Sequence, residues 1–407
     1  MSSVAPRIVR VSPLDALHTG TRSFAVFGPI EPVSRDDIYR RLHQLTAMGP
    51  TTRVGLIPTP GTTQWQYEPS LDSVIVEEVP EPANAAELHA ALLASRSTAP
   101  MRIVSAGKYL ATEYDHGFGE IAFARSLHEV LALGLERAQT TLPSSRLRPP
   151  LSALGLVLGR HPLRAAALLR GQESAEEPGT DEELTEPNAV DVDWTPSTAM
   201  LTFTMPRETV QAVRDYRDQA MPGVSLFSLL TAATYRMLAR ELQAQSAVAI
   251  PFDCRRFLPS RMLVWGNFVA GLEFELPADI SAASLQERLA QAARNGRPAA
   301  NVLVSAAKAH VALRRGGLPP IPTQVSSTPR PRVLFSSMGT TPRSDNDPLA
   351  LKEYVANSDP GGPESLTVCS ANVGGSVQTT VSFHSNVFDI ATVRDIFQRL
   401  YADPLNH

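Results

Sequence analysis

The fold prediction starts from residues 114–121, which read Tyr114-Asp115-His116-Gly117-Phe118-Gly119-Glu120-Ile121. Two apolar runs before this stretch, Met101–Ala106 and Tyr109–Thr112, predict strands, and Ala122–Leu133 after it has the apolar spacing of a helix. His116 is therefore expected where a strand ends and a helix begins. Glycines allow the backbone to turn sharply there and to approach a ligand. A histidine in such a turn, with a carboxylate to orient it, is one way to build a general base.

The composition of the 407 residues argues against several classes of function. The net charge is −4, and phosphate binding requires a basic surface, so nucleic acid is not expected as a main partner. The two cysteines, Cys254 and Cys369, lie in no CxxC or Cys/His cluster, so neither a disulfide framework nor a zinc site is expected. No Walker loop, GxGxxG, GxSxG or HExxH motif is present to indicate nucleotide, hydrolase or metalloprotease chemistry.

The chain shows no pattern that predicts a membrane span. Residues 1–20 lack the basic-then-apolar order of a secretion signal, and no run of 18 apolar residues occurs. With two unpaired cysteines, this favours a cytoplasmic protein. The most apolar stretch, Leu151–Leu169, contains two arginines, a histidine and a proline. It predicts a packed helix with a proline break, the alternative being a helix that lies on a membrane surface.

The length predicts two or three domains. Residues 172–187 are acidic and rich in Glu, Gly and Pro, which is typical of a linker or mobile loop. We therefore predict an N-terminal lobe over 1–170 that carries His116, a linker over 171–198 and a C-terminal lobe over 199–407. Strands and helices alternate without a strict βαβ rhythm, which favours an α/β fold with mixed sheets over a doubly wound one.

Three stretches, taken in order along the chain, carry a family resemblance. Residues 114–121 resemble an HHxxxDG motif in which Asp115, Glu120 and Ile121 replace the first histidine, the aspartate and the last glycine. Residues 250–259, in which the strand predicted over Ala247–Phe252 ends shortly before Arg255, precede a Gly-Asn-Phe sequence at 266–268, and 333–339 resembles a strand that faces a substrate channel. In this order the chain resembles the CoA-dependent acyltransferase superfamily. That superfamily includes chloramphenicol acetyltransferase, nonribosomal peptide condensation domains and polyketide-associated acyltransferases.

The resemblance implies two chloramphenicol-acetyltransferase-like lobes in a V-shaped pseudo-dimer, with the active site in a tunnel at their junction. His116 would be the general base, and Glu120 would form an ion pair with Arg255, or failing that with Arg256, which stiffens the site. A structural alternative stands beside each role. His116 could simply fill a turn, and Glu120 could be a solvated carboxylate that a helix start favours.

The resemblance also implies a reaction. An acyl group on CoA, or on the phosphopantetheine arm of a carrier protein, would move to a hydroxyl or amine of a small molecule of specialised metabolism, as in antibiotic biosynthesis. The thioester would be a co-substrate, with no bound cofactor or metal, and the protein a monomer. Five residues are predicted to contact substrate, and for the polar strand-end residues among them the alternative is that they satisfy backbone groups. They are Asp115, Ile121, Asn267, Ser336 and Ser337.

The two departures at Asp115 and Ile121 leave a second hypothesis open. A protein of the same fold could carry out altered chemistry on a bound intermediate. It could also be a non-catalytic module that binds a carrier protein. A branched isoleucine adds bulk and stiffness where the motif has glycine, which would narrow the predicted tunnel.

Overall fold

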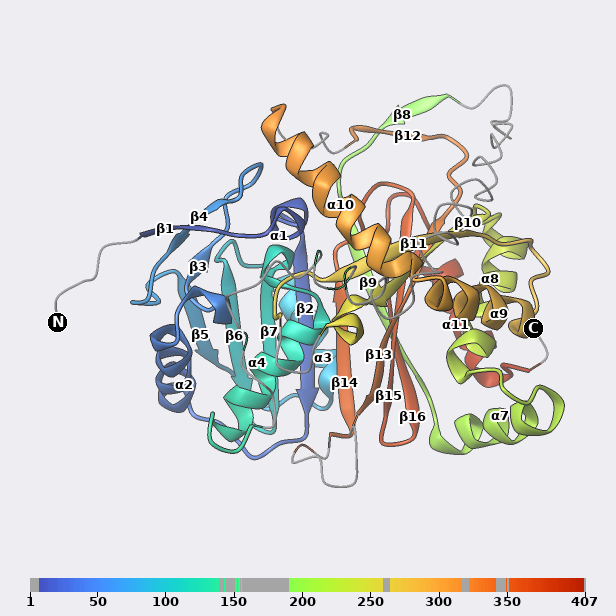
Figure 1. Ribbon diagram of the computed structural model, residues 1–407. Coiled ribbons are helices and arrows are strands. Elements are labelled where there is room, and N and C mark those ends of the chain that lie inside the picture. Colours follow the sequence, from blue (N-terminus) through green and yellow to red (C-terminus); the bar gives the residue numbers. More distant parts are fainter. Residues whose placement is uncertain are drawn as a thin grey trace.

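The computed structural model describes residues 7–138, 143, 151, 153, 155, 190–258, 264–316, 322–341, 349 and 351–405. Figure 1 shows these residues as two lobes side by side, each built on a β-sheet with helices packed against it. The predicted α/β fold with mixed sheets is confirmed. Most of the linker predicted over 171–198, and most of the helix predicted over 151–169, lie outside the described residues.

The first lobe contains a five-stranded sheet in the order β14-β2-β7-β6-β5. β5 and β6 run parallel, and the other neighbouring strands run antiparallel. The central strand β7 is buried along its whole length, as expected where helices cover both faces. The strands are β2 (Arg22–Gly28), β5 (Val74–Glu78), β6 (Met101–Ala106), β7 (Tyr109–Asp115) and β14 (Glu353–Ser358).

Two apolar cores lie on opposite faces of this sheet. Ala25 and Phe27 of β2 belong to one core, and Phe24 and Val26 belong to the other, because successive strand residues point to opposite faces. The first core is covered by α2 (Arg35–Ala47) and α4 (Ile121–Leu133), and the second by α3 (Ala85–Ala94). The lobe also holds β1 (Arg7–Arg10), α1 (Pro13–Leu17), η1 (Pro50–Thr52), β3 (Leu56–Ile57) and β4 (Gln64–Tyr67), in which the strands form a sheet ordered β1-β4-β3.

The second lobe contains a six-stranded sheet in the order β11-β10-β13-β15-β16-β9. β13 runs parallel to both neighbours, and the remaining pairs are antiparallel. The strands are β9 (Thr198–Met205), β10 (Ala247–Asp253), β11 (Val269–Glu275), β13 (Arg332–Thr341), β15 (Ser365–Val373) and β16 (Ser376–His384). Its helices are α7 (Arg207–Ala220), α8 (Leu226–Leu242), α9 (Ala282–Arg294), α10 (Arg297–Arg314) and α11 (Ile390–Ala402). β8 (Asp191–Asp193) and β12 (Gln324–Ser326) pair separately. None of the helices in the described ranges is long and apolar enough to cross a membrane.

Strand β14 joins the two lobes. It lies late in the chain, between β13 and β15, yet it pairs with β2 in the first sheet, with Tyr354 opposite Phe27. The side-chain amide of Gln378 on β16 accepts a hydrogen bond from Tyr354 N (2.7 Å) and donates one to Lys352 O (2.8 Å). The sequence analysis predicts no strand over Glu353–Ser358. The two lobes are therefore not simply successive in the chain, since one strand of the predicted C-terminal lobe completes the first sheet.

Candidate active site

The turn that carries His116 is held in place by its own residues. β7 ends at Asp115, a short 3-10 helix η2 covers His116–Phe118, and α4 begins at Ile121 with Glu120 as its N-cap. The buried carboxylate of Asp115 accepts hydrogen bonds from Gly117 N (2.8 Å) and Gly20 N (2.9 Å). Burial raises the pKa of Asp115, and these two hydrogen bonds act in the opposite direction.

Gly119 shows why this turn needs glycine. Its φ of 150° lies in a region that other residues rarely adopt. A Cβ there would lie 2.3 Å from Trp265 O, which belongs to the second lobe. The backbone of the turn thus lies directly against the second lobe.

An ion pair joins the turn to the second lobe. Glu120 Oε2 lies 2.6 Å from Arg255 Nη2, and Phe268 N donates to Glu120 Oε1 (2.5 Å). Both charged side chains are largely buried, and Arg255 also donates to Val264 O and Gly266 O, each at 2.7 Å. Burial alone would lower the pKa of Arg255, but the carboxylates of Glu120 and Asp253 outweigh it and the pKa is raised. The predicted contact between Glu120 and Arg255 is confirmed, while Arg256 instead lies over the ring of Phe257.

A second connection between the lobes runs through Asn267 and Asp15. Asn267 Nδ2 donates to His116 O (3.0 Å) and Gly117 O (3.2 Å), and its backbone N–H donates to Asp15 Oδ1 (2.9 Å). The other oxygen of Asp15, which is fully buried, pairs with Arg53 Nη1 at 2.8 Å. Asp15 is absent from the sequence predictions. The sequence feature that could have indicated Asp15 is the capping box Ser12-Pro13-Leu14-Asp15, which the structure contains at the start of α1.

The imidazole of His116 is half-buried between two other polar side chains. Its Nδ1 lies 3.0 Å from Ser23 Oγ, and its ring contacts the ring of His18 at a centroid distance of 4.8 Å. Burial, followed by the neighbouring His18, lowers the pKa of His116 to about 3, against a backbone hydrogen bond with Gly119. The ring is therefore neutral at neutral pH and keeps one nitrogen lone pair. Ser23 and His18 are further site residues that the sequence did not predict.

The remaining predicted site residues are distributed over several places. Ser336 and Ser337 lie on β13 and line a cavity of about 170 Å³ together with residues of α8, β15, β16 and α11; His116 is not among its lining residues. Ile121 packs against the core of the first lobe. Asp115 and Asn267 brace the turn, as described above. The predicted contacts of all five residues with substrate stay predictions.

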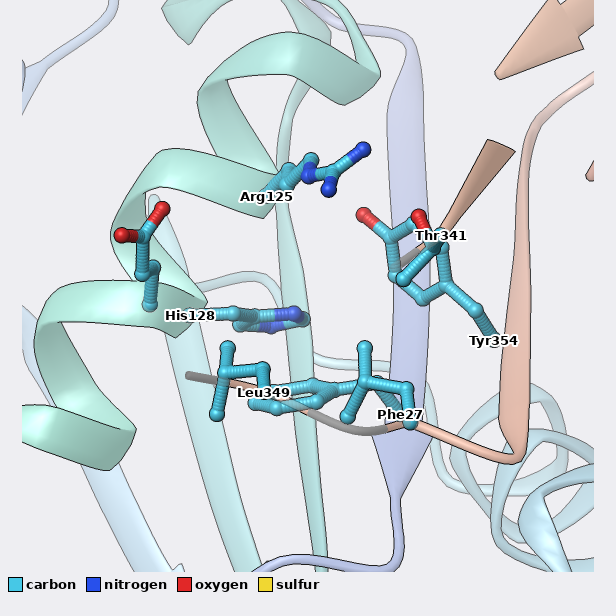
Figure 2. A pocket seen from close by; sticks show the side chains of 8 residues that line it. Phe27, Arg125, His128, Thr341, Leu349 and Tyr354 are labelled. Carbon is cyan, nitrogen blue, oxygen red and sulfur yellow. The ribbon is translucent and has the colours of Figure 1, made fainter. Parts of the chain in front are cut away.

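A much smaller cavity lies beside another histidine, His128 of α4 (Figure 2). Its volume is about 20 Å³, enough for a single water molecule. The His128 ring stacks on Phe27 at 4.4 Å, and its Nε2 lies 2.6 Å from Thr112 Oγ1. This histidine belongs to the core of the first lobe and lies apart from the turn of His116. In the described part of the chain, no three His, Cys, Asp or Glu side chains are grouped to hold a metal ion.

Comparisons with known proteins find the fold in solved structures only. No family model matches the chain, and no curated protein matches it. The trichothecene 15-O-acetyltransferase TRI3 of Fusarium sporotrichioides superposes with a TM-score of 0.63 at 11% identity, covering 98% of this chain and 95% of that one. The condensation domain of the monacolin K polyketide synthase MokA gives 0.58 at 13% identity, covering 99% and 97%.

The chain has the fold of these acyltransferases and condensation domains. A third structure extends the match: F. sporotrichioides TRI101, described as complexed with coenzyme A and T-2, gives a TM-score of 0.57 at 13% identity and covers 98% of this chain and 97% of that one. Since nearly the full length of each chain is covered, the match includes both lobes and the junction between them. The resemblance inferred from the sequence is therefore confirmed at the level of the fold.

Proposed function

We propose that this protein is an acyltransferase with His116 as its general base. The observation that carries the proposal is the buried Glu120–Arg255 ion pair, which joins the histidine turn of one lobe to the second lobe. Together with the Asn267 amide, it holds the backbone of residues 116–120 at the junction. Acyltransferases and condensation domains share this two-lobed fold, which supports the same class of chemistry here.

In the proposed mechanism, Ser23 selects the useful tautomer of His116. If Nδ1–H donates to Ser23 Oγ, Nε2 keeps its lone pair. Nε2 then takes the proton of an acceptor hydroxyl or amine while the acceptor atom attacks the thioester carbonyl. The tetrahedral oxyanion collapses, the C–S bond breaks, and the thiolate leaves with the proton from the imidazolium. The acyl group moves directly, and no covalent bond to the protein forms.

We infer the donor and acceptor classes from the fold and the cavity. The donor is a thioester of CoA or of a carrier-protein phosphopantetheine, as co-substrate rather than resident cofactor. The acceptor is a small molecule of specialised metabolism. The cavity of about 170 Å³ that Ser336 and Ser337 line supports a substrate-binding role for β13, because it combines apolar walls with several hydroxyl groups.

One observation favours a second candidate function. An imidazole with a pKa of about 3 is a weak base, and a good general base has a pKa near the working pH. Ile121, which stands where the motif has glycine, packs against the core of the first lobe. A protein of this fold that binds a carrier protein or a bound intermediate without transferring the acyl group is therefore the alternative.

A thiol-release assay separates the two functions. Acetyl-, octanoyl- and benzoyl-CoA and an acylated carrier protein serve as donors, and a panel of aliphatic and aromatic alcohols and amines serves as acceptors. We expect acceptor-dependent thiol release, reduced roughly 10²–10⁴-fold by His116→Ala. The same replacement at the exposed His43 is the control and leaves the rate unchanged. Thiol release that is equal in His116→Ala and the wild type would contradict the proposal.

A further inference from the structure

A second imidazole lies against His116. The rings of His18 and His116 are 4.8 Å apart between centroids, with an interplanar angle of 67°, so one ring presents its edge to the other. His18 comes from the loop that follows α1, 98 positions before His116 in the sequence. No motif at residues 114–121 indicates it.

His18 has a hydrogen-bonded backbone. It is the C-cap of α1, and its backbone N–H donates to Asp15 O at 3.2 Å. Asp15 is itself fixed by its ion pair with Arg53 and by the N–H of Asn267. Side chains placed on such fixed supports keep the geometry that catalysis requires.

The ring nitrogens of His18 remain available. The ring is half-buried and makes no hydrogen bond to a residue of the described ranges, although it packs against His116. Burial lowers the pKa of His18, against the nearby carboxylates of Glu120 and Asp15, so the ring is neutral and carries one N–H at neutral pH. The Asn267 amide near His116 is in use, since it binds the carbonyls of the turn.

We propose that His18 is a second catalytic residue of the transfer, whose neutral N–H donates a hydrogen bond to the thioester carbonyl oxygen. As the acceptor attacks, this oxygen becomes an oxyanion, and the hydrogen bond strengthens. His18 keeps its proton throughout, and the acceptor proton goes to His116. A neutral imidazole can polarise a carbonyl in this way. The inference rests on the proposed acyl transfer.

Three substitutions separate hydrogen-bond donation from packing. His18→Phe keeps an aromatic ring and removes the N–H, whereas His18→Gln and His18→Asn replace the ring with an amide N–H. We expect kcat for thiol release to fall about 10²–10³-fold in His18→Phe, the loss typical of one oxyanion donor, with KM little changed. In at least one of the two amide variants, kcat should be at least about tenfold higher than in His18→Phe. The matched control is His43→Phe, at an exposed position, which should leave kcat unchanged.

The outcomes distinguish this inference from the proposed function. If the wild type transfers no acyl group, the proposed function fails and the role of His18 fails with it. If the wild type is active but His18→Phe equals it, or exceeds both amide variants, only the role of His18 is overturned. If His18→Phe does not fold, as judged by circular dichroism and thermal unfolding, His18→Leu replaces it in a comparison with His18→Asn of nearly equal size.

Discussion

At the scale of single residues, the charge on Glu120 decides how firmly the histidine turn is held. Glu120→Gln keeps the size of the side chain but leaves the largely buried guanidinium of Arg255 with one carboxylate partner, the more exposed Asp253. Removing one partner of a buried ion pair costs roughly 3–5 kcal/mol, and we expect about 3 kcal/mol because Asp253 remains. Denaturant unfolding measures this loss, with Arg294→Gln as the control, since Arg294 pairs with Glu287 on the surface and such pairs contribute under about 1 kcal/mol. A loss no larger than that of the control would show that the pair does not stabilise the turn.

At the scale of the elements, β14 joins the lobes through Gln378. Gln378→Leu removes the acceptor for Tyr354 N and the donor to Lys352 O, and it leaves the buried N–H of Tyr354 unpaired, while Lys352 lies at an exposed position. An unsatisfied buried group costs about 1–3 kcal/mol, so we expect the unfolding free energy to fall by roughly 1–3 kcal/mol. The exposed Gln211→Leu on α7 is the control and should change it by less than about 0.5 kcal/mol. Equal stability of the two variants in urea unfolding would show that the hydrogen bonds of Gln378 to β14 do not stabilise the protein.

The same elements show how far the sequence predicts the site. Apolar periodicity located the strands and helices around 114–121, and the resemblance predicted the contact of Glu120 with Arg255, which the structure contains. The sequence did not predict β14, because its six residues contain too few apolar positions to show a period. Nor did the sequence predict that β14 pairs with a strand more than 300 positions earlier. His18 and Ser23 were missed for the same reason. Each reaches His116 only through the tertiary fold, and neither stands in a local pattern that indicates chemistry.

At the scale of the whole molecule, buried histidines make stability depend on pH. Burial lowers the pKa of His89 to about 4 and that of His128 to about 3, both below the usual 6.5 of an unfolded chain. At a pH between the folded and the unfolded pKa of these histidines, the unfolded state binds more protons than the folded state. Their contribution to the free energy of unfolding is therefore fully present above about pH 6.5 and is lost as pH falls toward 4. For His89 the loss reaches about 3 kcal/mol, at 1.36 kcal/mol per pKa unit.

Urea unfolding between pH 7.5 and 5, above the range where most carboxylates titrate, should therefore show a falling free energy of unfolding. His89→Phe should make that slope shallower, while the exposed His43→Phe should leave it unchanged. A free energy that stays flat from pH 7.5 to 5 would mean that these imidazoles gain protons without unfolding the chain.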